Sequence, residues 1–303
     1  MSIFFAIIAF IIAGLLTFVD KLIENKVPLK IVLLSKSIVF TLFSLIVMGA
    51  NKDFENGFFT DFVELEWLYL GLICLLAVIS FIFFNIALRR HENAEFNVLS
   101  DSSLLFFINI LLLATSFKNF IPNADASHII YLVIELLAIV GAIIVTIINS
   151  IKNGAKVLDF VYLGIFTLSL AGCFILKKLF LTRPTQHLDI VVCYSSFAIT
   201  IASIINLFIG KIEIKKIQWQ NILILVVSAA MACAFYLFAT KAVAENGANV
   251  SVINMIISLS FLIPVGFSLF EKIKEKKPLL EIIMPSSFLL VGVISFLLLN
   301  VIE

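Results

Sequence analysis

Three ionisable side chains lie well inside long apolar runs of this sequence, at Lys36, Asp101 and Glu135. An ionised side chain at the centre of a membrane helix costs roughly 2.5–3.5 kcal/mol on insertion scales, so each of them needs a partner or a role. A buried carboxylate can accept a proton or bind an amine, and a buried ammonium can attract a carboxylate. These residue types therefore suggest charge recognition or proton transfer inside a bilayer.

Two of the three are candidates for a central cavity. Lys36 is expected about two turns into its helix. There it either attracts a carboxylate or pairs with Asp101, or it extends its side chain to the nearer interface. Asp101 follows Asn97 by four residues, so the two share one helix face. Asp101 is either a proton acceptor or substrate counter-ion in the cavity, or a residue that hydrogen-bonds the start of its helix.

Uncharged polar side chains inside the apolar runs can bridge helices or contact a substrate. Asn249 and Asn254 lie in one run, where Asn249 could also cap the helix start.

The third ionisable residue, Glu135, is expected in a helix on the outside of the protein, at the interface or paired with a neighbouring helix. The predicted substrate-binding residues are Lys36, Asn85, Asn97, Asp101, Tyr236, Asn249 and Asn254.

Signatures of catalysis are missing from the sequence. The histidines and cysteines are scattered, without metal-ligand spacing or a C-x-x-C pair. Neither a nucleotide-binding P-loop nor a G-x-S-x-G nucleophile elbow occurs. No basic patch with interleaved aromatic residues suggests nucleic acid. We therefore expect no enzyme, no catalytic residue, no metal and no cofactor.

The elements that position the candidate residues are long apolar helices. Of the 303 residues, 62% are hydrophobic and 14% charged, whereas soluble domains are about 45–50% apolar and about 25% charged. A run of roughly 17–25 apolar residues is long enough to span a bilayer. Ten such runs predict an all-α polytopic membrane protein, with spans at residues 3–19, 29–50, 66–88, 95–117, 128–149, 157–180, 188–210, 219–241, 248–270 and 282–301.

The ten spans divide into two similar groups of five. FFNIALR at residues 83–89 resembles FYLFATK at residues 235–241, which favours an ancient duplication. Because five is odd, the two copies must cross the membrane in opposite directions, as in many transporters. The predicted domains are two inverted five-helix repeats, residues 1–152 and 153–303. A second match relates Ala13-Gly14 and Lys21-Leu22 to Ala171-Gly172 and Lys178-Leu179.

The second half carries a recognisable passage. Residues 239–272 contain an A-x-x-x-x-x-E-N-G-A-N-V helix end and then a span with Ser260 and Pro264 that ends in Phe270-Glu271-Lys272. This passage resembles the drug/metabolite transporter superfamily, in its ten-helix EamA-like family. That family has a Leu-Gly-Glu-Arg-like sequence at the same place, so a phenylalanine replaces its glycine here. The first half departs from the pattern, because it has no equivalent of this glutamate.

Early in the second span, Pro28 followed by Lys36 is similar to the family's proline and basic residue. The resemblance implies a secondary active transporter of small polar or amphipathic metabolites, an exporter driven by protons or exchange through a midplane cavity. In that cavity Asp101 would titrate or pair, with Lys36 as its partner.

Other functions stay open at this stage. An importer of a sugar or nucleoside is the alternative within transport, and a non-transporting subunit or an intramembrane enzyme is less favoured. The expected partners are the lipid bilayer, a small-molecule substrate and protons. Frequent Phe, Ile, Lys and Asn suit an AT-rich bacterial genome, and hence a multi-pass protein of a bacterial inner membrane.

Overall fold

The computed structural model describes residues 1–23, 26–50, 64–91, 93–120, 126–181, 188–209, 218–244, 250–275 and 279–301. Within these ranges the chain consists of helices and short turns, without a strand. The helices are α1 (Ser2–Ile23), α2 (Leu29–Ala50), α3 (Glu64–Leu88), α4 (Asn93–Phe120), α5 (Ala126–Lys152), α6 (Val157–Leu181), α7 (Leu188–Phe208), α8 (Trp219–Ala244), α9 (Val250–Ser258), the 3₁₀ turn η1 (Leu259–Phe261), α10 (Leu262–Lys274) and α11 (Leu280–Val301).

These helices confirm the all-α polytopic prediction. Nine spans in the described ranges are long and apolar enough to cross a membrane, with α9, η1 and α10 forming one of them, and α11 adds a shorter apolar stretch. The first span differs from the expected residues 3–19, because α1 continues to Ile23. Asp20 therefore lies inside the bundle and is buried.

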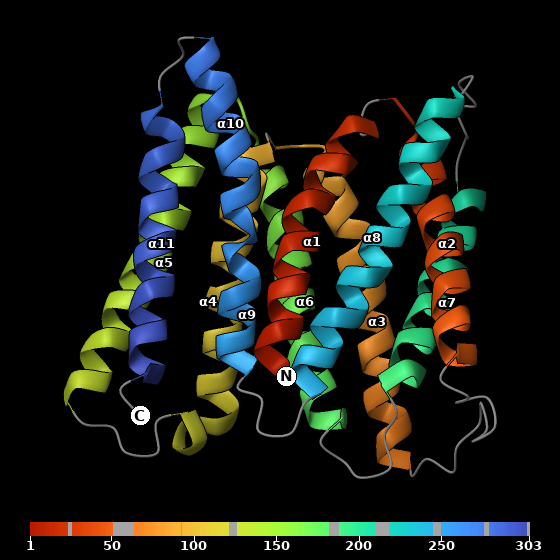
Figure 1. Cartoon of the computed structure of the whole chain (residues 1–303), viewed down its shortest axis with the longest axis horizontal. Coiled ribbons are helices and arrows are strands. Elements are labelled where there is room, and N and C mark those ends of the chain that lie inside the picture. Colours follow the sequence, from red (N-terminus) through yellow and green to blue (C-terminus); the bar gives the residue numbers. More distant parts are fainter. Residues whose placement is uncertain are drawn as a thin grey trace.

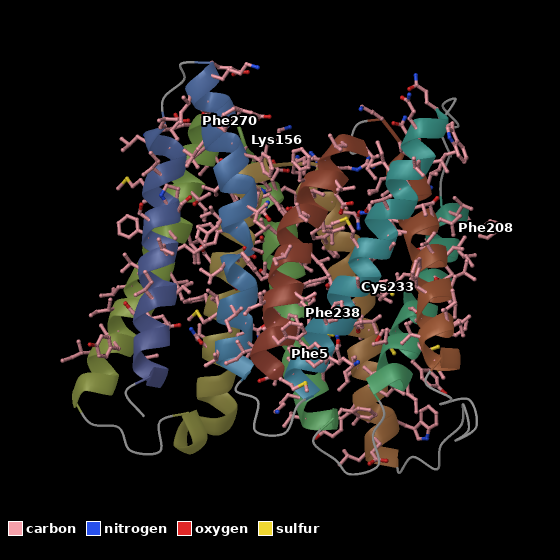
Figure 2. All side chains as sticks on the ribbon, in the orientation of Figure 1. Phe5, Lys156, Phe208, Cys233, Phe238 and Phe270 are labelled. Atoms are coloured by element: carbon pink, nitrogen blue, oxygen red, sulfur yellow. The ribbon has the colours of Figure 1, made fainter. Side chains whose placement is uncertain are left out.

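The outer surface of the bundle is apolar. Leu42 and Leu137 are more than half exposed although they lie near the middle of long helices. Phe208 likewise points away from the other helices at the end of α7 (Figure 2). A soluble protein seldom exposes so continuous an apolar surface, and lipid covers it in a membrane protein. The chain is therefore a multi-pass membrane protein.

Helices from distant parts of the sequence form the closest pairs (Figure 1). The helix α5 packs along α11 at one edge, α2 packs along α7 at the other, and α1–α8 and α3–α6 pairs lie between. Phe5 of α1 and Phe238 of α8 stack with ring centroids 6.1 Å apart (Figure 2). The chain begins and α11 ends at the lower end of the bundle in Figure 1, and α1 ends at the upper end.

The helix α4 has the lowest hydropathy of the nine spans and is also the most enclosed. Its many polar side chains would be costly in lipid, so burial among other helices is the favourable arrangement. Beside it, the ninth span is interrupted by η1, where α1 approaches closely. A Cβ added at Gly14 of α1 would lie only 2.6 Å from Ile263 Cδ1 and 2.9 Å from the Ser260 carbonyl oxygen.

Candidate functional site

A cavity of about 160 Å³ lies among α1, α2, α3, α4, α6, α7, α8 and the interrupted ninth span. Helices from both halves of the sequence contribute to its walls. A largely apolar cavity with a few polar groups is the usual form of a small-molecule site. The aromatic part of the lining consists of Phe40, Phe81, Phe84, Phe96, Phe166, Phe174, Phe235 and Tyr236.

A buried ion pair forms part of the wall toward the upper end. Lys36 Nζ lies 2.7 Å from Asp20 Oδ1, and only 3% and 2% of these side chains are exposed. Lys36 also donates a hydrogen bond of 3.3 Å to Asn85 Oδ1, and the Ser228 hydroxyl donates to Asp20. The network links α1, α2, α3 and α8 and neutralises both charges.

This network corrects the predicted pairing of Lys36. Its partner is Asp20 rather than Asp101, and the burial of the ammonium excludes the alternative in which Lys36 reaches the membrane interface. The prediction missed Asp20 because it ended the first span one residue too early. A helix extended by one turn would have brought this acid into consideration.

Asp101 lies at a different part of the cavity wall. It is about 12 Å along α4 from the first residue of the helix, so it does not cap the helix start. Asp101 Oδ2 accepts a hydrogen bond of 3.3 Å from the hydroxyl of Ser260 on η1. The side chain is partly exposed, and because Asp101 lines the cavity, this exposure is to the cavity. The contact joins the fourth and ninth spans at the point where the ninth is interrupted.

The other predicted binding residues are distributed unevenly. Asn85, Asn97 and Tyr236 line the cavity together with Lys36 and Asp101. Asn254 is fully buried on α9 but is not among the residues that line it. Asn249 lies outside the residues that the structure describes.

Glu135 pairs with a neighbouring helix, which was one of the two arrangements expected for it. Its Oε1 accepts a hydrogen bond of 2.5 Å from Asn109 Nδ2, which joins α5 to α4. Neither residue lines the cavity. This buried acid is therefore a contact between helices.

A second buried ammonium, which sequence reasoning also missed, belongs to Lys177 of α6. Only 2% of Lys177 is exposed, and its Nζ lies 3.4 Å from the centroid of the Tyr236 ring. It donates a hydrogen bond of 3.2 Å to the Thr240 hydroxyl. Across the described ranges, no carboxylate lies within ion-pair distance of it. The available signal was its place inside the sixth apolar run.

Comparison with known proteins shows the fold alone. No family model and no curated protein matches the sequence. Solved structures do match, and one described only as "Crystal structure of protein" superposes with a TM-score of 0.62 over 98% of each chain, at 13% identity. The bundle is thus an architecture that also occurs in another protein of nearly the same extent.

Proposed function

We propose that this chain is a secondary active transporter of small metabolites and a member of the EamA-like family of the drug/metabolite transporter superfamily. The observation that carries the proposal is a cavity of about 160 Å³ between helices of both sequence halves, with charged side chains in its wall. Charged groups inside a membrane bundle are costly, so those that occur are usually paired with one another or take part in binding or coupling. A bacterial inner membrane is the proposed location.

Two matched lysines support an inverted repeat. Lys21 on α1 donates a hydrogen bond of 2.6 Å to the carbonyl of Leu88, the last residue of α3. Lys178 on α6 donates one of 3.1 Å to the carbonyl of Val243, next to the last residue of α8. The two helix ends lie at opposite ends of the bundle (Figure 1). The same contact therefore recurs in the two halves with reversed direction.

The helix pairs support the same repeat. Shifted by five spans, α1 corresponds to α6 and α3 corresponds to α8. The pairing of α1 with α8 then has its counterpart in the pairing of α6 with α3, and both pairs pack along their length. In transporters built from inverted repeats, the substrate site lies at the repeat interface near the bilayer midplane, and we propose this position for the cavity, since both sequence halves line it.

Asp101 is the proposed coupling residue. As a carboxylate it accepts the hydrogen bond from Ser260, whereas a protonated carboxyl group can itself donate one. Proton binding or a substrate ammonium would therefore alter the contact between the fourth and ninth spans. A ligand that binds one arrangement of the two halves better than the other shifts the population toward it. Asn85, Asn97 and Tyr236 are proposed to contact the substrate.

The proposal is tested by counterflow and uptake in proteoliposomes against a metabolite panel, with and without a pH gradient. We expect the wild type to exchange at least one solute and to accumulate it when a gradient is applied. Asp101→Asn is expected to lose gradient-driven accumulation. Glu135→Gln is the matched control, since this buried acid lies outside the cavity, and it should transport as the wild type does. Normal accumulation by Asp101→Asn would remove the coupling role, and a wild type that moves no solute would contradict transport.

A further inference from the structure

The ammonium of Lys177 is buried and has only neutral partners among the described residues. They are the Thr240 hydroxyl, the Cys173 thiol, the Tyr236 ring and the Phe174 ring, whose centroid lies 5.7 Å from Nζ. Interactions of an ammonium with aromatic faces offset part of its desolvation. A buried charge without a counter-ion nevertheless remains costly. Among the residues whose side chains the structure describes, no negative charge balances this ammonium.

The matched position in the other half shows what is missing. Lys21 and Lys178 correspond, so the residues just before them, Asp20 and Lys177, correspond as well. The α2 helix supplies Lys36 as the counter-ion of Asp20. Its counterpart α7 carries no charged residue from Ile190 through Phe208. The described side chains of α7 therefore include no counter-ion for Lys177.

The unpaired ammonium lies directly behind the cavity wall. Phe174 and Tyr236 line the cavity and also contact Lys177. The Tyr236 hydroxyl is buried beside Ser195 and Cys173, but no described residue lies in good hydrogen-bond geometry with it. A carboxylate that enters between the Phe174 and Tyr236 side chains could accept hydrogen bonds from Lys177 Nζ and from the Tyr236 hydroxyl, which would satisfy both groups.

We propose that Lys177 and the Tyr236 hydroxyl form the subsite for the anionic group of the transported substrate, which is a small monocarboxylate with an aromatic or branched apolar body. The proposal rests on the proposed transport function. One ammonium matches one negative charge. The apolar body would lie among the phenylalanine side chains of the cavity, whose volume is close to that of an apolar cavity of about 150 Å³ that holds benzene.

The test measures binding of three probes of the same shape to the purified protein by calorimetry. Phenylacetate carries the negative charge, phenylacetamide is its neutral counterpart and 2-phenylethylamine carries a positive charge. We expect phenylacetate to bind the wild type at least about 10-fold more tightly than either comparator, because hydrogen bonds to charged groups are the stronger ones.

Variants of Lys177 test whether this residue causes the preference for phenylacetate. Lys177→Met keeps the approximate length of the side chain without its charge and should lose the 10-fold preference, whereas Lys177→Arg should retain it. Lys178→Met is the matched control, because this neighbouring lysine binds a backbone carbonyl outside the cavity, and it should bind phenylacetate as the wild type does.

Three results would overturn the subsite: a wild type that does not bind phenylacetate, equal binding of phenylacetamide, or an undiminished preference in Lys177→Met. The first two need no variant, so the test does not depend on the folding of Lys177→Met. Counterflow separates this proposal from transport itself. If the wild type binds phenylacetate selectively but exchanges no solute, transport fails and the anion subsite stands.

Discussion

The ion pair between Asp20 and Lys36 brings two opposite charges into a nearly dry environment at 2.7 Å. Each charge is tolerated because the other is present, and Asn85 and Ser228 add hydrogen bonds to the pair. Removing one partner leaves an uncompensated buried charge, whereas removing both leaves none. The pair should therefore show strong energetic coupling.

We expect Asp20→Asn and Lys36→Met each to lower the free energy of unfolding by roughly 3–5 kcal/mol. The double variant should lose clearly less than the sum of the two. Denaturant unfolding in detergent micelles measures all three values, and a double-mutant cycle gives the coupling energy. Additive losses would show that the two side chains do not interact in solution.

For individual residues, the sequence showed which side chains are unusual in an apolar run, but it did not show their partners. Polarity inside an apolar run was enough to single out Lys36 and Asp101, and the structure places both at one cavity. The partner of Lys36 depends on how α1 and α2 pack, and residues 16 positions apart carry no periodic signal of contact. Lys177 was missed although it lies within its predicted span, because it is near the end of that span.

Among the elements, a glycine of another helix allows close packing against the interrupted ninth span. At Gly14, α1 lies so close to η1 and α10 that a Cβ would meet Ile263 Cδ1 at 2.6 Å and the Ser260 carbonyl oxygen at 2.9 Å. The Ser260 hydroxyl in turn contacts Asp101. The separation of α1 from the ninth span therefore affects the proposed coupling contact.

Gly14→Ala is expected to push η1 away from α1 and to cost about 1–3 kcal/mol, as overpacking does in other tightly packed interiors. Transport should fall with it. Gly71→Ala is the matched control, since a Cβ there meets nothing within 4 Å. Thermal unfolding and counterflow of the two variants test this, and a Gly14→Ala protein as stable and active as Gly71→Ala would contradict the close approach.

The connection between α3 and α4 is held at the upper end by a buried histidine. His91 is 4% exposed, its Nε2 lies 3.5 Å from the Asp159 carbonyl oxygen and its ring packs on Phe160. Lys21 donates to the carbonyl of His91. Burial is the main cause that lowers the pKa of His91 below its usual value of 6.5, with the Lys21 charge acting in the same direction.

Because the pKa of His91 is lower in the folded protein, the imidazole of the unfolded chain is protonated at a higher pH than that of the folded protein. The contribution of His91 to stability is therefore full above pH 6.5, the ordinary pKa of the group, and is lost as the pH falls through the lower folded-state value. We expect His91→Gln to lose less stability than the wild type between pH 7.5 and pH 5, a range of roughly one unit or more on each side of the ordinary value. Thermal unfolding at a series of pH values measures this, and parallel curves would contradict it.

For the whole molecule, the number and order of the helices follow from run length and composition, since the bilayer fixes both the minimum length and the apolar character of a span. The enclosed position of α4 agrees with its low hydropathy, but it was not predicted. Which helices pair could not be read from the sequence, because every span is apolar on several sides. The α1–α8 and α3–α6 pairs could be identified only from the structure.

The central claim is that one cavity, formed by both halves, opens to each side of the membrane in turn. The direct measurement is thiol labelling of Ser80→Cys, a residue of the cavity wall, after the four native cysteines have been replaced. A membrane-impermeant thiol reagent is applied to right-side-out and inverted vesicles. Leu42→Cys, on the outer surface near the middle of α2, is the control and should stay unlabelled. We predict that Ser80→Cys is labelled from both sides of the membrane and that substrate reduces this labelling. Labelling from one side only, with or without a pH gradient, would contradict the claim.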